Sequence, residues 1–204
     1  MARMGSRIGI GAVGLAVLVA LALPAWAGAA TYAVDKDHTS VAFKVRHLFT
    51  SVIGHFGEFS GTIELDPAAP AAASVRGEIA ATSIDTNNAK RDEHLRSADF
   101  FDVAKHPSIA FVSTKVSDVD PAAKTAKLHG NLTMHGVTKP VVLDVAYLGT
   151  GKDPWGNVRG GFTATTTVTR KDFGLSWNET LETGGVLVGE EVEIEINVEG
   201  LLQE

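Results

Sequence analysis

Histidine is the residue type in this sequence with the widest range of chemistry, because its ring can bind a metal ion or exchange a proton near neutral pH. The chain contains seven histidines: His38, His47, His55, His94, His106, His129 and His135. No pair has the spacing of a helical zinc site, and there is no cysteine to complete a structural one. His47 with His55, and His129 with His135, would meet only across hairpins. We therefore expect no metal site and no cofactor.

A compact run of charged side chains, Arg91, Asp92, His94 and Arg96, lies in a segment that suits a solvated helix. Asp92 and Arg96 are four residues apart, which is the spacing of an ion pair on one helix face. One interpretation is that this pair stabilises an exposed helix. The other is that Arg91 or Arg96 presents its planar guanidinium to a phosphate or carbonyl head group. The sequence leaves both interpretations open.

Patterns typical of catalysis are missing from the sequence. There is no Gly-x-Ser-x-Gly elbow to expose a nucleophilic serine. Carboxylates such as Glu193 and Glu195 stand at alternate positions and are typical of a solvated strand face. We therefore expect that the protein is not an enzyme. Its formal net charge of −6 repels phosphate polymers, which argues against nucleic acid as a partner.

The elements that must position these residues are mainly β-strands, because apolar residues recur at every second position from Thr31 onward. Eight strands are predicted, at residues 41–47, 59–65, 75–81, 109–116, 126–134, 141–148, 161–169 and 191–199. Turn residues between them, such as Asp120-Pro121 and Gly184-Gly185, favour antiparallel connections. A closed barrel is favoured over a sandwich because closure removes exposed sheet edges.

One segment, residues 82–107, loses the alternation. Residues 88–97 predict a helix, with Asp85 or Thr86 as its cap, and a second short turn follows before Pro107. The predicted fold is therefore all-β: an antiparallel eight-stranded barrel with one or two short helices between strands.

The N-terminus has the pattern of a secretory signal peptide, predicted at residues 1–27. Arg3 and Arg7 precede an apolar run over residues 8–23, and Ala25-Trp26-Ala27 follows as a small-x-small cleavage pattern. The run is about sixteen residues, shorter than the roughly twenty of a permanent membrane helix. An uncleaved anchor is the alternative interpretation.

The remaining residues, 28–204, are expected to form one exported domain. No adjacent arginine pair precedes the apolar run, so the general secretory route is expected. The absence of cysteine excludes a lipid-anchored thiol and all disulfides, so stability must come from the core alone. We expect a periplasmic protein.

Five segments together resemble the YceI-like family of exported bacterial proteins. They are Tyr32-x-x-Asp35-x-x-His38-Thr39-Ser40-x-x-Phe43-x-Val45-x-His47-Leu48; Gly54-His55-Phe56-x-x-Phe59-x-Gly61; Thr86-x-x-x-x-Arg91-Asp92-x-His94-Leu95-Arg96-Ser97-x-Asp99-Phe100-Phe101-Asp102; Gly130-Asn131-Leu132-Thr133-x-x-Gly136-Val137-Thr138-Lys139-Pro140-Val141; and Arg170-x-Asp172-Phe173-Gly174. Phe49 and the Pro/Ala-rich loop at 66–73 depart from the family pattern. The resemblance implies an extended lipocalin-like barrel whose apolar lumen binds a polyisoprenoid or another chain-like amphiphile. No enzymatic activity is established for the family as a group.

Nine apolar side chains fall on the inward phases of their strands: Val41, Phe43, Val45, Phe59, Ile63, Phe111, Leu132, Val145 and Phe162. They either fill the interior or line a cavity, and periodicity alone does not separate these two cases. Gly61, Gly130 and Ala164 on the same phases leave space, which favours a cavity. Head-group contacts at the barrel mouth are predicted for Arg91, His94, Arg96, Phe101 and His47.

We therefore expect a soluble carrier or sequestering protein for a polyprenyl lipid or a quinone-like molecule. Transient membrane contact and a homodimer are compatible with an open apolar mouth. Two alternatives remain: a His-rich metal-binding or enzymatic module, and a filled barrel that acts through its surface as a stress or interaction protein.

Overall fold

A computed structural model describes residues 28–181 and 184–203 of the chain. The signal peptide predicted for residues 1–27 lies outside the described residues and stays a prediction. Among the described residues, no helix is long and apolar enough to cross a membrane.

All strands of the described chain belong to one antiparallel sheet. They are β1 (Ala30–Val34), β2 (Ser40–His47), β3 (Thr50–Phe56), β4 (Phe59–Leu65), β5 (Ser74–Ala80), β6 (Ile84–Asp85), β7 (Ser108–Asp120), β8 (Thr125–Met134), β9 (Val137–Lys152), β10 (Val158–Thr169) and β11 (Val188–Leu202). Short 3₁₀ turns interrupt them: η1 (Lys36–His38), η2 (Pro70–Ala72), η3 (Ala81–Ser83) and η4 (Arg170–Phe173).

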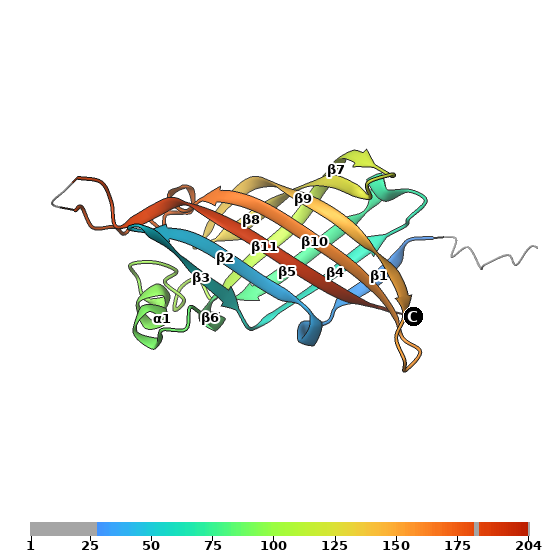
Figure 1. The fold of residues 1–204 in the computed structure, drawn as a ribbon, viewed down its shortest axis with the longest axis horizontal. Coiled ribbons are helices and arrows are strands. Elements are labelled where there is room, and N and C mark those ends of the chain that lie inside the picture. Colours follow the sequence, from blue (N-terminus) through green and yellow to red (C-terminus); the bar gives the residue numbers. More distant parts are fainter. Residues whose placement is uncertain (1–27, 182–183, 204) are drawn as a thin grey trace, which may run out of the picture.

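The sheet closes into a barrel of eight strands in the order β1-β4-β5-β7-β8-β9-β10-β11. Closure is made where β1 returns to β11, with Tyr32 opposite Leu202. β2 pairs further along β11, with Val41 opposite Ile196, and β3 and β6 continue the sheet beyond it. The predicted eight-stranded antiparallel barrel is confirmed. It is elongated, with the C-terminus at one end and α1 (Ala89–Arg96) at the other (Figure 1).

The single α-helix among the described residues, Ala89–Arg96, lies within the predicted residues 88–97, but its cap is neither Asp85 nor Thr86. Asn88 is its cap and accepts a hydrogen bond from the backbone N–H of Arg91 at 3.1 Å. The proposed cap Asp85 lies instead in β6, opposite His55 of β3, where its carboxylate accepts from the N–H of Asn87 at 2.7 Å. Pairing with β3 keeps Asp85 in an extended strand, so the cap falls at Asn88.

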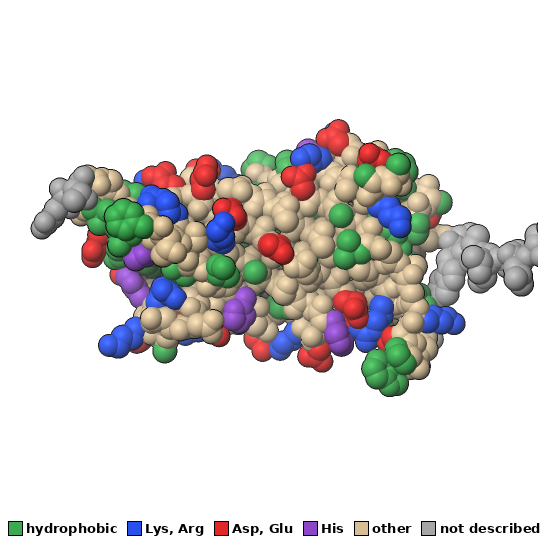
Figure 2. Space-filling model, viewed as in Figure 1, with side chains coloured by type: hydrophobic (Ala, Val, Ile, Leu, Met, Phe, Trp, Pro, Cys, Tyr) green, Lys and Arg blue, Asp and Glu red, His purple; other side chains and the backbone are tan. Residues whose placement is uncertain are grey.

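Two apolar clusters form the core, and they lie toward opposite ends of the barrel. One gathers near α1 and consists of Val41, Phe56, Ala81, Ile84, Ile109, Met134, Val168, Phe173 and Leu175. The other, Tyr32, Ile63 and Leu65, lies where β1 closes the ring. Outside, charged side chains of both signs are interspersed over the face shown in Figure 2. Alternation along each strand therefore separates an apolar interior from a charged exterior.

Candidate functional site

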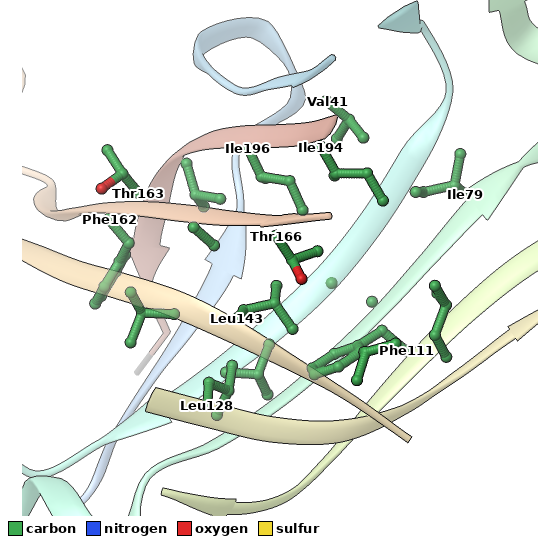
Figure 3. A pocket seen from close by; sticks show the side chains of 18 of the residues that line it. Val41, Ile79, Phe111, Leu128, Leu143, Phe162, Thr163, Thr166, Ile194 and Ile196 are labelled. Carbon is green, nitrogen blue, oxygen red and sulfur yellow. The ribbon is translucent and has the colours of Figure 1, made fainter. Parts of the chain in front are cut away.

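The barrel encloses a cavity of about 580 Å³, which we call the lumen. Every strand of the closed ring contributes side chains to its wall, and most of them are aliphatic or aromatic. Figure 3 shows Ile194 and Ile196 of β11 facing Leu143 of β9 and Phe111 of β7 across this space. The volume is within the range of about 300–1,000 Å³ typical of small-molecule sites. A filled interior is therefore excluded.

The side chains predicted to point inward all line the lumen: Val41, Phe43, Val45, Phe59, Ile63, Phe111, Leu132, Val145 and Phe162. Their contact with a ligand stays a prediction. Sequence reasoning missed other lining residues, among them Leu128, Leu143 and Ile194. The two-residue alternation carried the signal for these. Leu128 and Leu143 lie in phase with Leu132 and Val145, and Ile194 lies on the apolar face of the predicted strand 191–199.

Two of the lining phenylalanines lie against glycines of the neighbouring strand. A Cβ on Gly54 would stand 2.4 Å from Cζ of Phe43, and one on Gly130 would stand 2.3 Å from Cζ of Phe111. Both separations are far shorter than a van der Waals contact of about 3.5–4.0 Å. The glycines therefore let the rings lie close to the wall, which keeps space open in the lumen.

The polar side chain of Thr166 in the lumen wall is turned toward the backbone. The Thr166 hydroxyl, visible in Figure 3, donates to the carbonyl of Val142 at 2.8 Å. Because that bond occupies its only proton, the rest of the side chain meets the cavity as an apolar surface. At this position the wall therefore offers a ligand area to bury rather than a directional contact.

Arg170 is the buried cation of the wall and was not identified from the sequence. It continues the inward phase of Val168 and is only 4% exposed. Its Nε donates to the carbonyl of Gly189 at 2.9 Å, and Nη1 donates to those of Leu175 and Trp177 at 2.6 and 2.8 Å. Burial lowers the pKa of Arg170. The bonds from Nη1 hold the segment after η4 against the barrel, whereas Nη2 has no partner among the described residues.

The α1 end of the lumen is covered by side chains from the helix and the turn that follows. Leu95, Phe100 and Phe101 all line the cavity there. Phe101 meets Phe56 of β3 edge to face, with ring centroids 6.0 Å apart. Phe101 is thus the one member of the predicted mouth cluster that reaches the lumen.

Arg91 and Arg96, predicted to contact a head group, do not line the lumen, and their head-group contacts stay predictions. Arg91 donates from Nε to the hydroxyl and from Nη2 to the carbonyl of Thr86, both at 2.7 Å. Arg96 donates to the carbonyls of Thr82 and Ile84 at 2.7 and 2.6 Å. Both guanidiniums therefore anchor α1 to the segment 82–86 before it, and the geometry gives no support to a head-group role.

Asp92 likewise serves the fold. Its buried carboxylate accepts the backbone N–H and the hydroxyl of Thr86 at 2.9 and 2.5 Å. The ion pair expected between Asp92 and Arg96 is absent from the described part of the chain. Asp92 thus bonds to a fixed backbone group instead of forming a solvent-exposed ion pair, and this bond anchors the short helix.

The two histidines of the predicted mouth also lie outside the lumen wall. His94 packs edge to face against Phe100 and Trp177, with centroids 5.1 and 4.9 Å apart, and its Nε2 lies 2.9 Å from Oδ2 of Asp99. His47 ends β2 beside the start of β11. Head-group contacts for either residue stay predictions that the geometry does not favour.

The hairpin pairings suggested for the histidines are wrong. His55 lies instead 3.7 Å from Asp85, and His129 lies 2.8 Å from the hydroxyl of Ser117. His135, expected near His129, meets His106, with ring centroids 4.9 Å apart. Strand register fixes these partners, and register is not visible in the sequence.

An ion-pair network fastens the end of the barrel far from α1. Arg159 of β10 pairs with Asp35, with Asp153 at 2.9 Å and with Glu199 at 2.6 Å. The hydrogen bond from Arg159 is the main cause that lowers the pKa of Asp35 to about 2. The side chain of Asn157, and then Arg159, lower the pKa of Asp153 to about 2. The network ties β10, β11 and the β1–β2 connection together.

The fold and its cavity define a lipocalin-like binding barrel: a closed antiparallel sheet around an apolar lumen. The profile of the YceI-like domain matches residues 32–200. A UPF0312 protein of Vibrio cholerae is 45% identical over 167 residues, covering 80% of this chain and 86% of the relative. The chain belongs to the YceI-like family.

Solved structures give the same result. The Campylobacter jejuni YCEI protein is 33% identical, with a TM-score of 0.66 over 83% of this chain and 96% of that one. A polyisoprenoid binding domain from Saccharophagus degradans is 15% identical, with a TM-score of 0.58 over 84% and 98% of the two chains. The second likeness extends to the fold alone.

Proposed function

We propose that the protein is an exported carrier that holds a polyisoprenoid, or a similar chain-like amphiphile, in its lumen and performs no catalysis. The observation that carries the proposal is the 580 Å³ apolar cavity. It reaches from Ile63, near the closure of the ring, to Leu95 on α1. An apolar space that extends along the barrel suits a chain better than a compact ring system.

Burial alone supplies enough free energy for such a ligand. At about 24 cal/mol per Å³, filling the lumen is worth roughly 14 kcal/mol before costs. Association itself costs about 4–15 kcal/mol, so binding remains reversible. A carrier needs this balance, because its ligand must leave as well as enter.

The proposed export, the identity of the ligand and the membrane contact rest on other features. The signal pattern at residues 1–27 supports a periplasmic location by the general secretory route. The name of the Saccharophagus domain supports a polyisoprenoid, and a quinone tail has the same isoprenoid chemistry. Phe49, fully exposed at the tip of the β2–β3 hairpin, supports transient membrane contact. A homodimer stays a prediction without a structural argument.

The test is gentle purification, native mass spectrometry and organic extraction, followed by an uptake assay with geranylgeraniol. We expect a lipid to leave the protein on extraction and the emptied protein to bind the added prenol. A ligand-free mass together with no uptake would refute the proposal.

A matched pair of variants locates the binding. Ala164 lines the lumen between Val145 and Ile196, whereas its neighbour Thr165 is exposed. Ala164→Phe should weaken prenol binding by about tenfold or more, equivalent to about 1.4 kcal/mol. Thr165→Phe adds the same ring outside and should bind as the wild type does. Equal behaviour of the two variants would place the ligand outside the lumen.

A further inference from the structure

A second cluster of chemically active side chains lies outside the lumen, where the turn after α1 meets the β8–β9 turn. Asp102, His106 and His135 each offer one ligand atom, and these atoms lie within 4.8 Å of one another. The rings of His106 and His135 stand nearly perpendicular, at 74°, with centroids 4.9 Å apart. None of the three lines the lumen. The cluster is therefore independent of the proposed lipid site.

The protonation of His135 leaves a lone pair for a ligand bond. Its Nδ1 lies 3.1 Å from the carbonyl oxygen of Phe173. A carbonyl only accepts hydrogen bonds, so in the neutral ring Nδ1 carries the proton and Nε2 carries the lone pair. A bond from the second ring nitrogen to a backbone carbonyl is the usual way in which a metal-binding histidine is oriented.

The backbone around the cluster is arranged to bring the rings together. Asp102 and His135 have φ angles of 44° and 52°, in the left-handed region that ordinary residues rarely adopt. Gly136 follows with φ of 73°, and a Cβ there would stand 2.7 Å from Cε1 of His106. The glycine is needed for the ring of His106 to approach.

A comparison with another cluster shows why this one is a candidate. Asp35, His38 and Glu199 are also close enough together to hold an ion. There the guanidinium of Arg159 already pairs with both carboxylates. Beside Asp102 the cation is the ammonium of Lys105 at 2.7 Å, on a side chain that is 72% exposed. Such a surface pair is weak, so a divalent ion can displace the ammonium.

We propose that Asp102, His106 and His135 form a binding site for a divalent transition-metal ion of the Zn²⁺ type. Two imidazole nitrogens and one carboxylate oxygen are ligands that Zn²⁺ accepts, and water completes a tetrahedral shell. Bound metal would join the β8–β9 turn to the segment that carries Phe101. The site would thus fix the cover of the lumen at the α1 end.

The test is calorimetric titration of Zn²⁺ into protein purified without an affinity tag and stripped with EDTA. We expect saturable binding of one ion per chain. Asp102→Asn and His135→Asn should each weaken it by about tenfold or more, since loss of even an outer contact costs that much. Asparagine is chosen because it tolerates a positive φ. His129→Asn, the same change at a histidine bonded to Ser117, should bind as the wild type does.

Two outcomes would overturn the proposal: no saturable binding by the wild type, or unchanged binding by both cluster variants. X-ray absorption at the zinc edge of the wild-type protein gives a test that does not depend on the folding of variants. A shell containing two imidazoles and oxygen is expected, and a shell of oxygen alone would refute the assignment. These measurements do not depend on lipid binding. They therefore test the metal site even where the protein binds no prenol.

Discussion

The glycine beneath Phe43 makes a strong test of how the lumen is kept open. In Gly54→Ala, the new methyl would lie 2.4 and 2.8 Å from two ring carbons of Phe43, and 2.8 Å from Cγ2 of Thr86. All three neighbours are side-chain atoms. Because van der Waals contact requires about 3.5–4.0 Å, the ring must move by roughly an ångström. Phe43 lines the lumen, so the open direction leads into the cavity.

Overpacking of this kind costs about 1–3 kcal/mol of unfolding free energy. For a domain of this size each kcal/mol lowers Tm by about 2–4 °C, so Tm should fall by about 2–12 °C. The displaced ring also occupies ligand space, so binding of a prenol should weaken. Gly77→Ala is the matched control, because its Cβ would meet only the carbonyl of Ser60 at 3.9 Å. That variant should be as stable as the wild type.

A double-mutant cycle with Phe43→Leu separates the ring from other effects of the methyl group. Leucine does not reach the position of the ring carbons that approach Gly54, so the double variant should recover part of the loss. The remaining loss is the contact with Thr86. Thermal unfolding and chemical denaturation of all four proteins give the coupling free energy. Two results would refute the proposed packing of the Phe43 ring on Gly54. One is that the stability losses of the two single variants simply add in the double variant, and the other is that Gly54→Ala leaves Tm unchanged.

Two further variants test the ends of the barrel. The depressed pKa of Asp35, about 2, means that its pairing stabilises the fold fully above about pH 4 and is lost as pH falls toward 2. Arg159→Met should lower stability at neutral pH and make it less dependent on pH between 5 and 2, as measured by denaturation curves. An unchanged pH profile would contradict the assignment. Arg170→Met leaves the buried carbonyls of Leu175 and Gly189 without their donor. The free energy of unfolding, measured with urea, should therefore fall by at least about 2 kcal/mol. Wild-type stability would show that the guanidinium is dispensable.

The strands that carry the lumen wall were predictable because they alternate without interruption. Residues 126–134 and 191–199 fall within β8 and β11, and their inward phase is as predicted. β1 and β3 were missed for local reasons. β1 has only five residues, and β3 contains Thr50, Ser51 and Gly54, which hide the alternation. Pairing with β2 and β6 stabilises β3, and no local pattern reports such pairing.

The geometry gives the mouth prediction little support, because a residue type does not reveal which way its side chain is used. Arg91 was read as a ligand contact since a guanidinium suits phosphate, yet the same donors suit the carbonyl and hydroxyl of Thr86. The choice depends on where β6 places those acceptors. Conversely, Arg170 lies in phase with the lumen wall, but it follows the predicted strand 161–169 by one residue and was not considered.

The polar groups of the lumen wall show how the barrel selects a ligand. Thr166 and Arg170 face the cavity, and most of their donors bond to backbone carbonyls, whereas Nη2 of Arg170 has no partner among the described residues. A wall that is mostly apolar rewards buried apolar area more than contacts to a head group. Discrimination must therefore come from the length and thickness of the chain that fits past Phe43 and Phe111. The glycines beneath those rings, rather than any charged residue, are then the positions at which relatives with a different ligand should differ.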